Sequence, residues 1–511
     1  MKPPHRKLHL LLALSVWCSV CIYAHPGTLG FAELSLSIVR FHTFRIDHYA
    51  NLNEDQSYVN GHYYYGRPPG YSFLAMPAAL VVHGVWEYLV PEGVKTTIGR
   101  EVAARYANDP KFLARVALKD LTELILVSFL SIATVSSVSV ALLALLVQKF
   151  LTDRGLSELD AVCVAAAAIL GSLLGVFAAS NSNQVVATTL AFWSFHRLHS
   201  GMARSVSWLT AMITGLALAS SLVLEYQAVL ICGIIGCYAL YALAPARRVP
   251  FAIGTMVPVI LVMAYNGDCF GSPFVTAYRF PSGAGHWGTH ELHRSGFLGM
   301  GWPRLDSLVA FLVSTKVGYF VFMPATIGGI IYAVAAARRN QEPRIEAIVA
   351  LAAFLLYWIG SSTAAPEFAG TVFGPRFMIM SIPFVMLCTG LAVRAWPRGK
   401  SLARSSMILS VAICFVGLQY PMPMKAIGTA SNLFTEVYWP LMKQQFPYNL
   451  SIDYLGHLFR WGRLAYLSTN LLILFALIAV WAALVRYARR LDAESNCEPA
   501  TKQQPQQMLK P

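Results

Sequence analysis

Ionisable and aromatic side chains that could carry out chemistry are concentrated in residues 41–70, a polar segment between two apolar stretches. A hydroxyl group becomes a better nucleophile when a carboxylate takes its proton, and a guanidinium can hold a phosphate through two parallel hydrogen bonds. The segment contains both kinds of group. Its candidates for a catalytic base are Asp47, Glu54 and Asp55, and its candidates for binding a substrate are His62, Tyr64 and Arg67.

Each of these residues also has a purely structural interpretation. Asp47 and Asp55 are of a residue type that caps turns and short helices. Arg67 follows a run of tyrosines, and the whole group could be an aromatic belt at a membrane surface with the guanidinium paired to lipid headgroups. The residues alone leave these alternatives open.

Two positions far along the chain could join the same site. Arg376 follows Gly374-Pro375 at the start of an apolar run, so it is a second candidate for binding a phosphate. Glu225 lies between two apolar runs and could orient a ligand. Interfacial anchoring of Arg376 and a tight turn at Glu225 are the structural alternatives.

Composition places these residues in a membrane protein. Of the 511 residues, 56% are hydrophobic and 13% are charged, whereas about 25% are charged in soluble domains. Apolar runs long enough to cross ~30 Å of hydrocarbon recur along the chain. The net charge of +14 comes from Lys and Arg in short loops beside apolar runs, which is typical of orientation signals rather than of nucleic-acid binding. The expected fold class is an all-α polytopic membrane protein.

The apolar runs predict about twelve crossings with both chain termini in the cytoplasm. Residues 31–41 have the pattern of a helix lying in the membrane interface. Residues 71–90 are apolar, but five basic loops would fall outside if this run crossed, so it is expected to dip into the outer leaflet and return. The expected crossings are residues 9–23, 121–147, 159–178, 185–195, 208–224, 228–243, 251–265, 308–336, 345–363, 377–393, 406–420 and 467–485.

Three parts of the chain are expected on this basis. Residues 1–400 form the transmembrane catalytic module, residues 401–490 add transmembrane helices with an outer cap loop, and residues 491–511 are a disordered cytoplasmic tail. The nine cysteines show no metal or disulfide spacing. Three histidines are spaced as helix-borne metal ligands, but neighbouring glycines disfavour a helix there, so no metal site is predicted: His286, His290 and His293.

The order of these motifs resembles the GT-C superfamily of glycosyltransferases, which use polyprenyl-phosphate sugars. The resemblance is carried by the acid-bearing loop after the first helix, the Gly61-His62-Tyr63-Tyr64 turn, Pro68-Pro69-Gly70 and the later Gly374-Pro375-Arg376. It is most specific over residues 31–77. The chain looks like bacterial members related to protein O-mannosyltransferases and to the aminoarabinose transferases that modify lipid A.

The resemblance implies an inverting sugar transfer on the extracytoplasmic side of the inner membrane. The donor would be a polyprenyl-phosphate sugar, and the acceptor a hydroxyl of a lipid, glycan or protein. It implies an outer-loop acid as the base, here Asp47 or Asp55, and stabilisation of the departing phosphate by Arg67 and Arg376. No cofactor is implied, and a requirement for a divalent metal is left open.

This chain departs from many relatives in two respects: its acids come later than the first helix's end, and Arg67 stands where those relatives have Lys. A transporter or flippase of a lipid-linked sugar is the alternative function. The scarcity of ionisable residues inside the apolar runs disfavours it.

Overall fold

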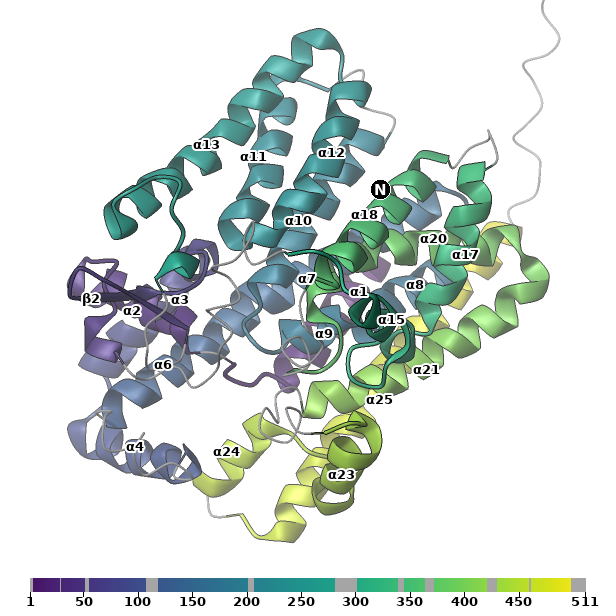
Figure 1. Ribbon diagram of the computed structural model, residues 1–511. Helices are drawn as coiled ribbons and strands as arrows, with labels where there is room; N and C mark the ends of the chain where they lie inside the picture. Colours follow the sequence, from purple (N-terminus) through teal and green to yellow (C-terminus); the bar gives the residue numbers. More distant parts are fainter. Residues whose placement is uncertain are drawn as a thin grey trace, which may run out of the picture.

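The computed structural model describes residues 3–27, 29–50, 55–106, 118–200, 206–280, 301–338, 344–363, 372–420, 430–458 and 461–497. In this part the chain is almost entirely helical, with one two-stranded antiparallel sheet (Figure 1). The all-α class expected from the sequence is confirmed. The elements in order are α1 (Pro3–Ile22), α2 (Gly30–Phe41), η1 (Asp47–Tyr49), β1 (Gln56–Val59), β2 (His62–Tyr65), α3 (Gly70–Tyr88), α4 (Glu92–Tyr106), α6 (Leu118–Ser131), η2 (Ile132–Ser136), α7 (Ser137–Asp153), α8 (Glu158–Leu170), α9 (Leu173–Ala178), α10 (Asn183–His199), α11 (Trp208–Leu224), η4 (Tyr226–Ala228), α12 (Val229–Ala242), α13 (Pro245–Phe270), η5 (Ala277–Arg279), α15 (Leu305–Val313), α16 (Tyr319–Phe322), α17 (Ala325–Arg338), α18 (Arg344–Ser361), η6 (Arg376–Ser381), α20 (Ile382–Ala395), η7 (Pro397–Gly399), α21 (Lys400–Gln419), η8 (Phe434–Tyr438), α23 (Trp439–Gln445), α24 (Leu450–Leu458) and α25 (Arg463–Cys497).

Long apolar helices make this an integral membrane protein. Within the described residues, six helices are long and apolar enough to cross a membrane, and a bent pair raises the number to seven. The expected count of about twelve crossings is not confirmed, because several apolar runs form helices of 10–17 residues. The six long helices are Asp120–Asp153, Pro245–Phe270, Arg344–Ser361, Arg376–Ala395, Pro397–Gln419 and Arg463–Glu494.

Two runs expected to be single crossings are broken. Residues 308–336 form α15, α16 and α17, because the backbone turns so tightly at Gly318 that a Cβ atom there would lie 2.3 Å from the Ser314 carbonyl oxygen. Residues 159–178 form α8 and α9. The break lies at Ser172, which is the N-cap of α9. Its hydroxyl accepts a hydrogen bond from the Leu174 amide at 3.2 Å and so starts a new helix inside the apolar run.

The apolar run at residues 71–90 forms α3, which is followed at once by α4. The two helices are bent by 120° at the break between them. The expectation that this run dips into the membrane and returns remains a prediction, since such a bend suits both a re-entrant segment and a broken span.

Tight helix contacts set the arrangement of the apolar helices. The helix that contains η6 and α20 is the most enclosed of the long spans, since 89% of its apolar segment is buried inside the protein. Helices α11 and α13 touch through glycines: a Cβ atom at Gly215 would lie 2.1 Å from the Phe251 carbonyl oxygen, and one at Gly254 would lie 2.0 Å from that of Met212. Only glycine permits backbones this close. With α12, these helices extend away from the rest of the molecule (Figure 1).

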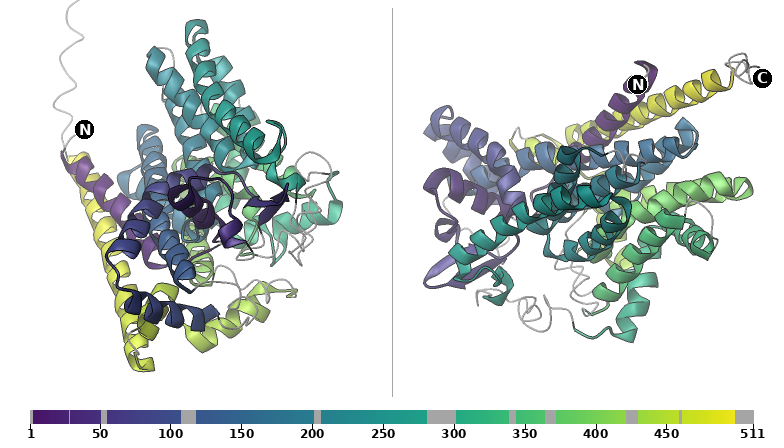
Figure 2. Two further views of the ribbon diagram at one scale, coloured as in Figure 1. Left: turned by 90° about the vertical axis from the view of Figure 1, so that its left-hand side faces the viewer. Right: turned by 90° about the horizontal axis from the view of Figure 1, so that it is seen from above.

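Basic loops expected in the cytoplasm gather at one end of the bundle. Arg404 donates a hydrogen bond to Asp160 at 2.7 Å, Arg394 donates to the Arg154 carbonyl, and His5 pairs with Glu158 at 3.0 Å. The beginning of α1 and the end of α25 lie at this end as well, far from the β-hairpin in the right view of Figure 2.

The C-terminal part adds α21, η8, α23 and α24 before the long helix α25. Helix α25 continues to Cys497, so the disordered tail expected from residue 491 is helical in its first residues. The reason is that residues 486–494 keep strong helix formers and an Arg490–Glu494 ion pair at 2.7 Å. Residues 498–511 lie outside the described part.

Candidate active site

The β-hairpin places an aspartate and an arginine beside each other. Its strands pair in the register Gln56↔Tyr65, and the two-residue turn Asn60-Gly61 has positive φ at both positions, as a type I′ turn requires. Asp55 precedes the first strand and Arg67 follows the second, so the two lie at the open end of the hairpin. Their side chains form an ion pair of 2.5 Å and are 23% and 26% exposed.

Arg67 is fixed by the turn that leads into α3. Pro68-Pro69 follows it, and Gly70 begins the helix against the end of α11: a Cβ atom at Gly70 would lie 2.6 Å from the Val223 carbonyl oxygen. This contact brings Arg67 close to the residue that follows α11. Desolvation is the largest single influence on the pKa of Arg67 and lowers it, but Asp55 together with Tyr65, Tyr278 and Glu225 outweighs this effect. The pKa is therefore raised above the ordinary arginine value.

Glu225 is the buried acid at the end of α11. It accepts hydrogen bonds from the Asn183 amide at 3.0 Å and from the Gln227 backbone N–H at 3.3 Å. Burial raises the pKa of this carboxyl above its ordinary value of 4.5, although the Gln227 N–H and the charges of Arg67 and Arg376 act in the opposite direction. Glu225 is therefore an acid whose proton affinity is increased next to two guanidinium groups.

Arg376 completes the group from a distant part of the chain. Gly374 takes a positive φ of 68°, and the turn at Gly374-Pro375 starts η6 with Arg376 as its first residue. Arg376 interacts electrostatically with Arg67, Asp55 and Glu225. Its buried Nε atom has no hydrogen-bond partner among the described residues, so a donor is available for an anionic ligand.

Two tyrosines border the charged group. Tyr278, in η5, interacts electrostatically with Glu225 and Arg67, and its ring contacts that of Tyr226 with centroids 5.8 Å apart. Burial raises the pKa of Tyr278 and of Tyr65 well above 10, which keeps both hydroxyls protonated. The buried Tyr65 hydroxyl has no hydrogen-bond partner within the described ranges, so it is another available donor.

The structure therefore brings together four residues named from the sequence: Asp55, Arg67, Glu225 and Arg376. Sequence reasoning missed Asn183, which orients Glu225, and Tyr278. Tyr278 could have been considered, because it is an aromatic residue in a polar stretch between two apolar runs. Asn183 gave no signal, because an asparagine at a helix start is an ordinary cap.

Three other named residues lie away from this group, Asp47 in η1 and His62 and Tyr64 in β2. Asp47 pairs with His62 at 2.8 Å and accepts from the Tyr63 N–H at 2.6 Å, and its side chain is 43% exposed. Tyr64 packs against Phe270, with ring centroids 5.8 Å apart. Glu54 lies outside the described residues.

A second charged cluster holds the hairpin's surroundings in place. One guanidinium of α2 donates to two carboxylates of α6 and to a tyrosine of η1, and two histidines pair with the same carboxylates. These contacts join α2, η1 and α3 to α6 and provide a structural role for the residues Arg40, His48, Tyr49, His83, Asp120 and Glu123.

In the part of the chain that the structure describes, no three His, Cys, Asp or Glu side chains form a group that could hold a metal ion. His286, His290 and His293, which were weighed as metal ligands, lie outside the described residues. The site described above contains two guanidiniums, two carboxylates and two tyrosine hydroxyls. Such a group suits a phosphate-bearing ligand and a proton transfer beside it.

Comparison with known proteins supports the fold. No protein-family model and no curated protein sequence matches the chain. Its structure is similar to the crystal structure of ArnT from Cupriavidus metallidurans bound to undecaprenyl phosphate, with 14% sequence identity, a TM-score of 0.50, and coverage of 100% of this chain and 84% of that one. The apo structure of the same protein gives 15% identity, a TM-score of 0.48 and coverage of 95% and 74%. The chain therefore has an ArnT-like fold, as the resemblance seen in the sequence implied.

Proposed function

We propose that this protein is an inverting glycosyltransferase that moves a sugar from a polyprenyl-phosphate donor to a hydroxyl acceptor at the outer face of the inner membrane. The observation that carries the proposal is the meeting of Arg67 and Arg376, from opposite halves of the chain, with Asp55 and Glu225 in one partly buried group. The ArnT-like fold supports it, because the similar ArnT structure was solved with undecaprenyl phosphate bound.

The two guanidiniums bind the phosphate of the donor. Arginine holds a phosphate through a planar set of donors. Burial and the charge of Arg67 lower the pKa of Arg376 to about 10, so both guanidiniums are charged at neutral pH. As the bond between the sugar's anomeric carbon and the phosphate oxygen breaks, negative charge grows on that oxygen. Arg67, Arg376 and the Tyr65 hydroxyl can stabilise it, and such preorganised donors act most strongly where water is excluded.

A carboxylate of the site takes the proton of the acceptor. Asp55 is the base in this proposal, since it is the outer-loop acid that lies beside the guanidiniums, whereas Asp47 lies in η1 and pairs with His62 at the surface. The acceptor oxygen attacks the anomeric carbon as Asp55 removes its proton, and the polyprenyl phosphate leaves with its electron pair. A single displacement of this kind inverts the anomeric configuration.

Charge and topology support the proposed location of the reaction. The basic loops and the two helical ends gather on the side away from the hairpin, and positively charged loops stay in the cytoplasm. This arrangement supports an extracytoplasmic site built entirely from residues 1–400, the part proposed as the catalytic module.

A transfer assay with purified protein tests the function. The protein is incubated with a panel of radiolabelled polyprenyl-phosphate sugars and host membranes, and the labelled acceptor is identified. We expect one donor to yield labelled acceptor, and yield to be lost in Arg67→Ala and Arg376→Ala variants that still insert and fold. Movement of lipid-linked sugar across liposomes without any glycosylated product would instead show a flippase.

A further inference from the structure

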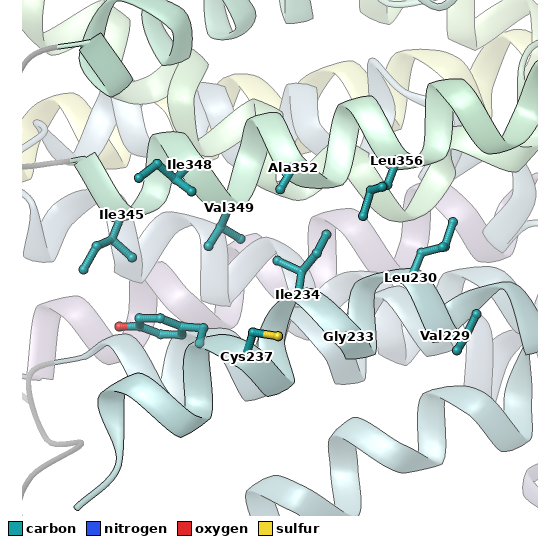
Figure 3. A pocket seen from close by; sticks show the side chains of 11 residues that line it. Val229, Leu230, Gly233, Ile234, Cys237, Ile345, Ile348, Val349, Ala352 and Leu356 are labelled. Atoms are coloured by element: carbon teal, nitrogen blue, oxygen red, sulfur yellow. The ribbon is translucent and has the colours of Figure 1, made fainter.

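An apolar groove lies between α12 and α18 and is separate from the charged group. Its volume is about 630 Å³, and apolar side chains from both helices face each other across it (Figure 3). Gly233 forms an open part of its wall on α12. The lining residues of the two helices include Leu230, Ile234 and Cys237 on one side and Val349, Ala352 and Leu356 on the other.

One end of the groove adjoins the charged site. Val229 lines it and directly follows η4, the turn that begins after Glu225. On the other helix, Leu356 lines it beside Tyr357, whose hydroxyl donates to the Gln227 carbonyl at 2.9 Å. The groove therefore starts within one helical turn of Glu225, which itself interacts with both guanidiniums.

From that end the groove runs toward the cytoplasmic side of the bundle. The lining residues of α12 span Val229 to Tyr238, about 14 Å at 1.5 Å per residue. The Tyr238 hydroxyl bonds to His199, which pairs with the buried Glu346 at 3.2 Å. The groove thus crosses about half of a ~30 Å hydrocarbon layer and ends near a charged cluster that an apolar chain would avoid.

We propose that this groove binds the first isoprene units of the donor's polyprenyl chain. The inference rests on the proposed function and adds the site for the lipid portion of the substrate. If Arg67 and Arg376 hold the phosphate, the attached polyprenyl chain enters the membrane at the depth where the groove begins. The wall is apolar along its length, and burial of each methylene group contributes about 0.8 kcal/mol. The remaining isoprene units lie in the bilayer.

The two glycines of α12 provide a matched pair of variants. A Cβ atom at Gly233 or at Gly236 would have no atom within 4 Å, so both positions accept a side chain without a backbone clash. Gly233 lines the groove and Gly236 does not. A Gly233→Phe variant fills the groove, whereas Gly236→Phe makes the same chemical change outside it.

Photocrosslinking tests the assignment without relying on turnover. The purified wild-type protein in nanodiscs is given a polyprenyl phosphate with a diazirine among its first isoprene units, and crosslinked peptides are mapped by mass spectrometry. We expect crosslinks on α12 and α18, at least about tenfold fewer in Gly233→Phe, since about two methylene groups of burial correspond to that factor, and an unchanged yield in Gly236→Phe.

The outcomes separate the groove from the proposed function. Crosslinks on other helices in the wild type, or an unchanged yield in Gly233→Phe, would overturn the groove while a positive transfer assay leaves the function standing. Equal competition by phosphatidylglycerol would show a general lipid site and also overturn the assignment. Absence of any binding of polyprenyl phosphate, together with no sugar transfer, would refute both. The wild-type map decides the question even if Gly233→Phe does not fold.

Discussion

Arg67 takes part in two interactions that compete in a glycosyl transfer. In the free protein it pairs with Asp55 at 2.5 Å. A donor phosphate between Arg67 and Arg376 would draw the guanidinium toward itself and release Asp55 for the acceptor proton. Binding of the donor would then activate the base, which limits proton transfer to the time when the sugar is present.

Asp55→Asn should reduce sugar transfer by about 10² to 10⁴-fold, the range that a positioned general base contributes, with little change in donor binding. Initial rates with saturating donor measure this effect. Asp306→Asn is the matched control, because Asp306 forms a comparable 2.7 Å ion pair with Arg304 on the exposed surface. A larger loss in Asp47→Asn than in Asp55→Asn would move the base to Asp47.

Arg67→Lys should weaken binding of polyprenyl phosphate by roughly tenfold. Lysine keeps the charge but loses the planar set of donors that grips two phosphate oxygens. Titration of the phosphate without sugar measures this loss, and Arg304→Lys serves as a control at an exposed pair. Unchanged binding in Arg67→Lys would remove Arg67 from the phosphate site.

Glu225→Gln should change how stability depends on pH. The pKa of Glu225 is raised above 4.5 by burial, so the folded state favours the protonated form. The stability from this group is complete below pH 4.5 and is lost as pH rises through the folded pKa. Unfolding temperatures from pH 4 to 8 should therefore fall more steeply in the wild type than in Glu225→Gln. Parallel curves would contradict the raised pKa.

At the scale of elements, glycine contacts determine where the charged residues meet. Gly70 lets α3 begin against the backbone of α11, and this contact holds Arg67 next to Glu225. The asparagine–glycine turn of the hairpin performs a similar role for Asp55 and Arg67 by fixing the strand register. The site thus depends on backbone approach as much as on its own side chains.

Gly70→Ala should lower both stability and transfer. Its Cβ atom would overlap the Val223 carbonyl oxygen at 2.6 Å, so α3 must shift, at a cost of about 1–3 kcal/mol. Gly84→Ala in the same helix is the control, since a Cβ atom there meets nothing within 4 Å. Thermal unfolding in detergent and the transfer assay measure the two effects. Equal unfolding temperatures and equal transfer rates in both variants would show that α3 can move away from α11 at no measurable cost.

Sequence patterns predicted these elements with uneven success. Hydropathy located nearly every apolar helix, because burial in lipid requires long apolar runs whatever the tertiary contacts. It missed the breaks at Gly318 and Ser172, where local backbone geometry ends a helix inside an apolar run. The meeting of Glu225 with Arg67 was also beyond a one-dimensional pattern, since it depends on the contact at Gly70. The motifs identified Arg67 and Arg376 because their proline turns are local.

At the scale of the whole molecule, charge and shape agree on one orientation. Basic residues of the connecting loops pair at one end of the bundle. The start of α1 and the end of α25 lie together, far from the hairpin (Figure 2). The start of α1 contacts the end of α25, with the Lys7 ammonium 5.2 Å from the centre of the Tyr487 ring. The Trp481 indole also donates to Ser19 at 3.0 Å.

Both termini should therefore be cytoplasmic. A fluorescent protein that matures only in the cytoplasm, fused to either end, should give signal in both fusions. A reporter active only outside the cytoplasm, inserted at the hairpin turn after Asn60, should be active as well. Fluorescence from one terminal fusion alone would contradict the shared side of α1 and α25.

The pairing of the first helix with the last has a consequence for biogenesis. Asp492, near the end of α25, accepts hydrogen bonds from the backbone N–H groups of Glu158 and Leu159 at 2.8 and 3.2 Å. The ribosome delivers this carboxylate after all the helices that it joins. During insertion, α1 and the start of α8 are therefore in place without their partner until α25 has been translated. In chains arrested before α25, the surfaces of α1 and α8 that α25 covers would stay exposed and could be recognised by membrane quality control.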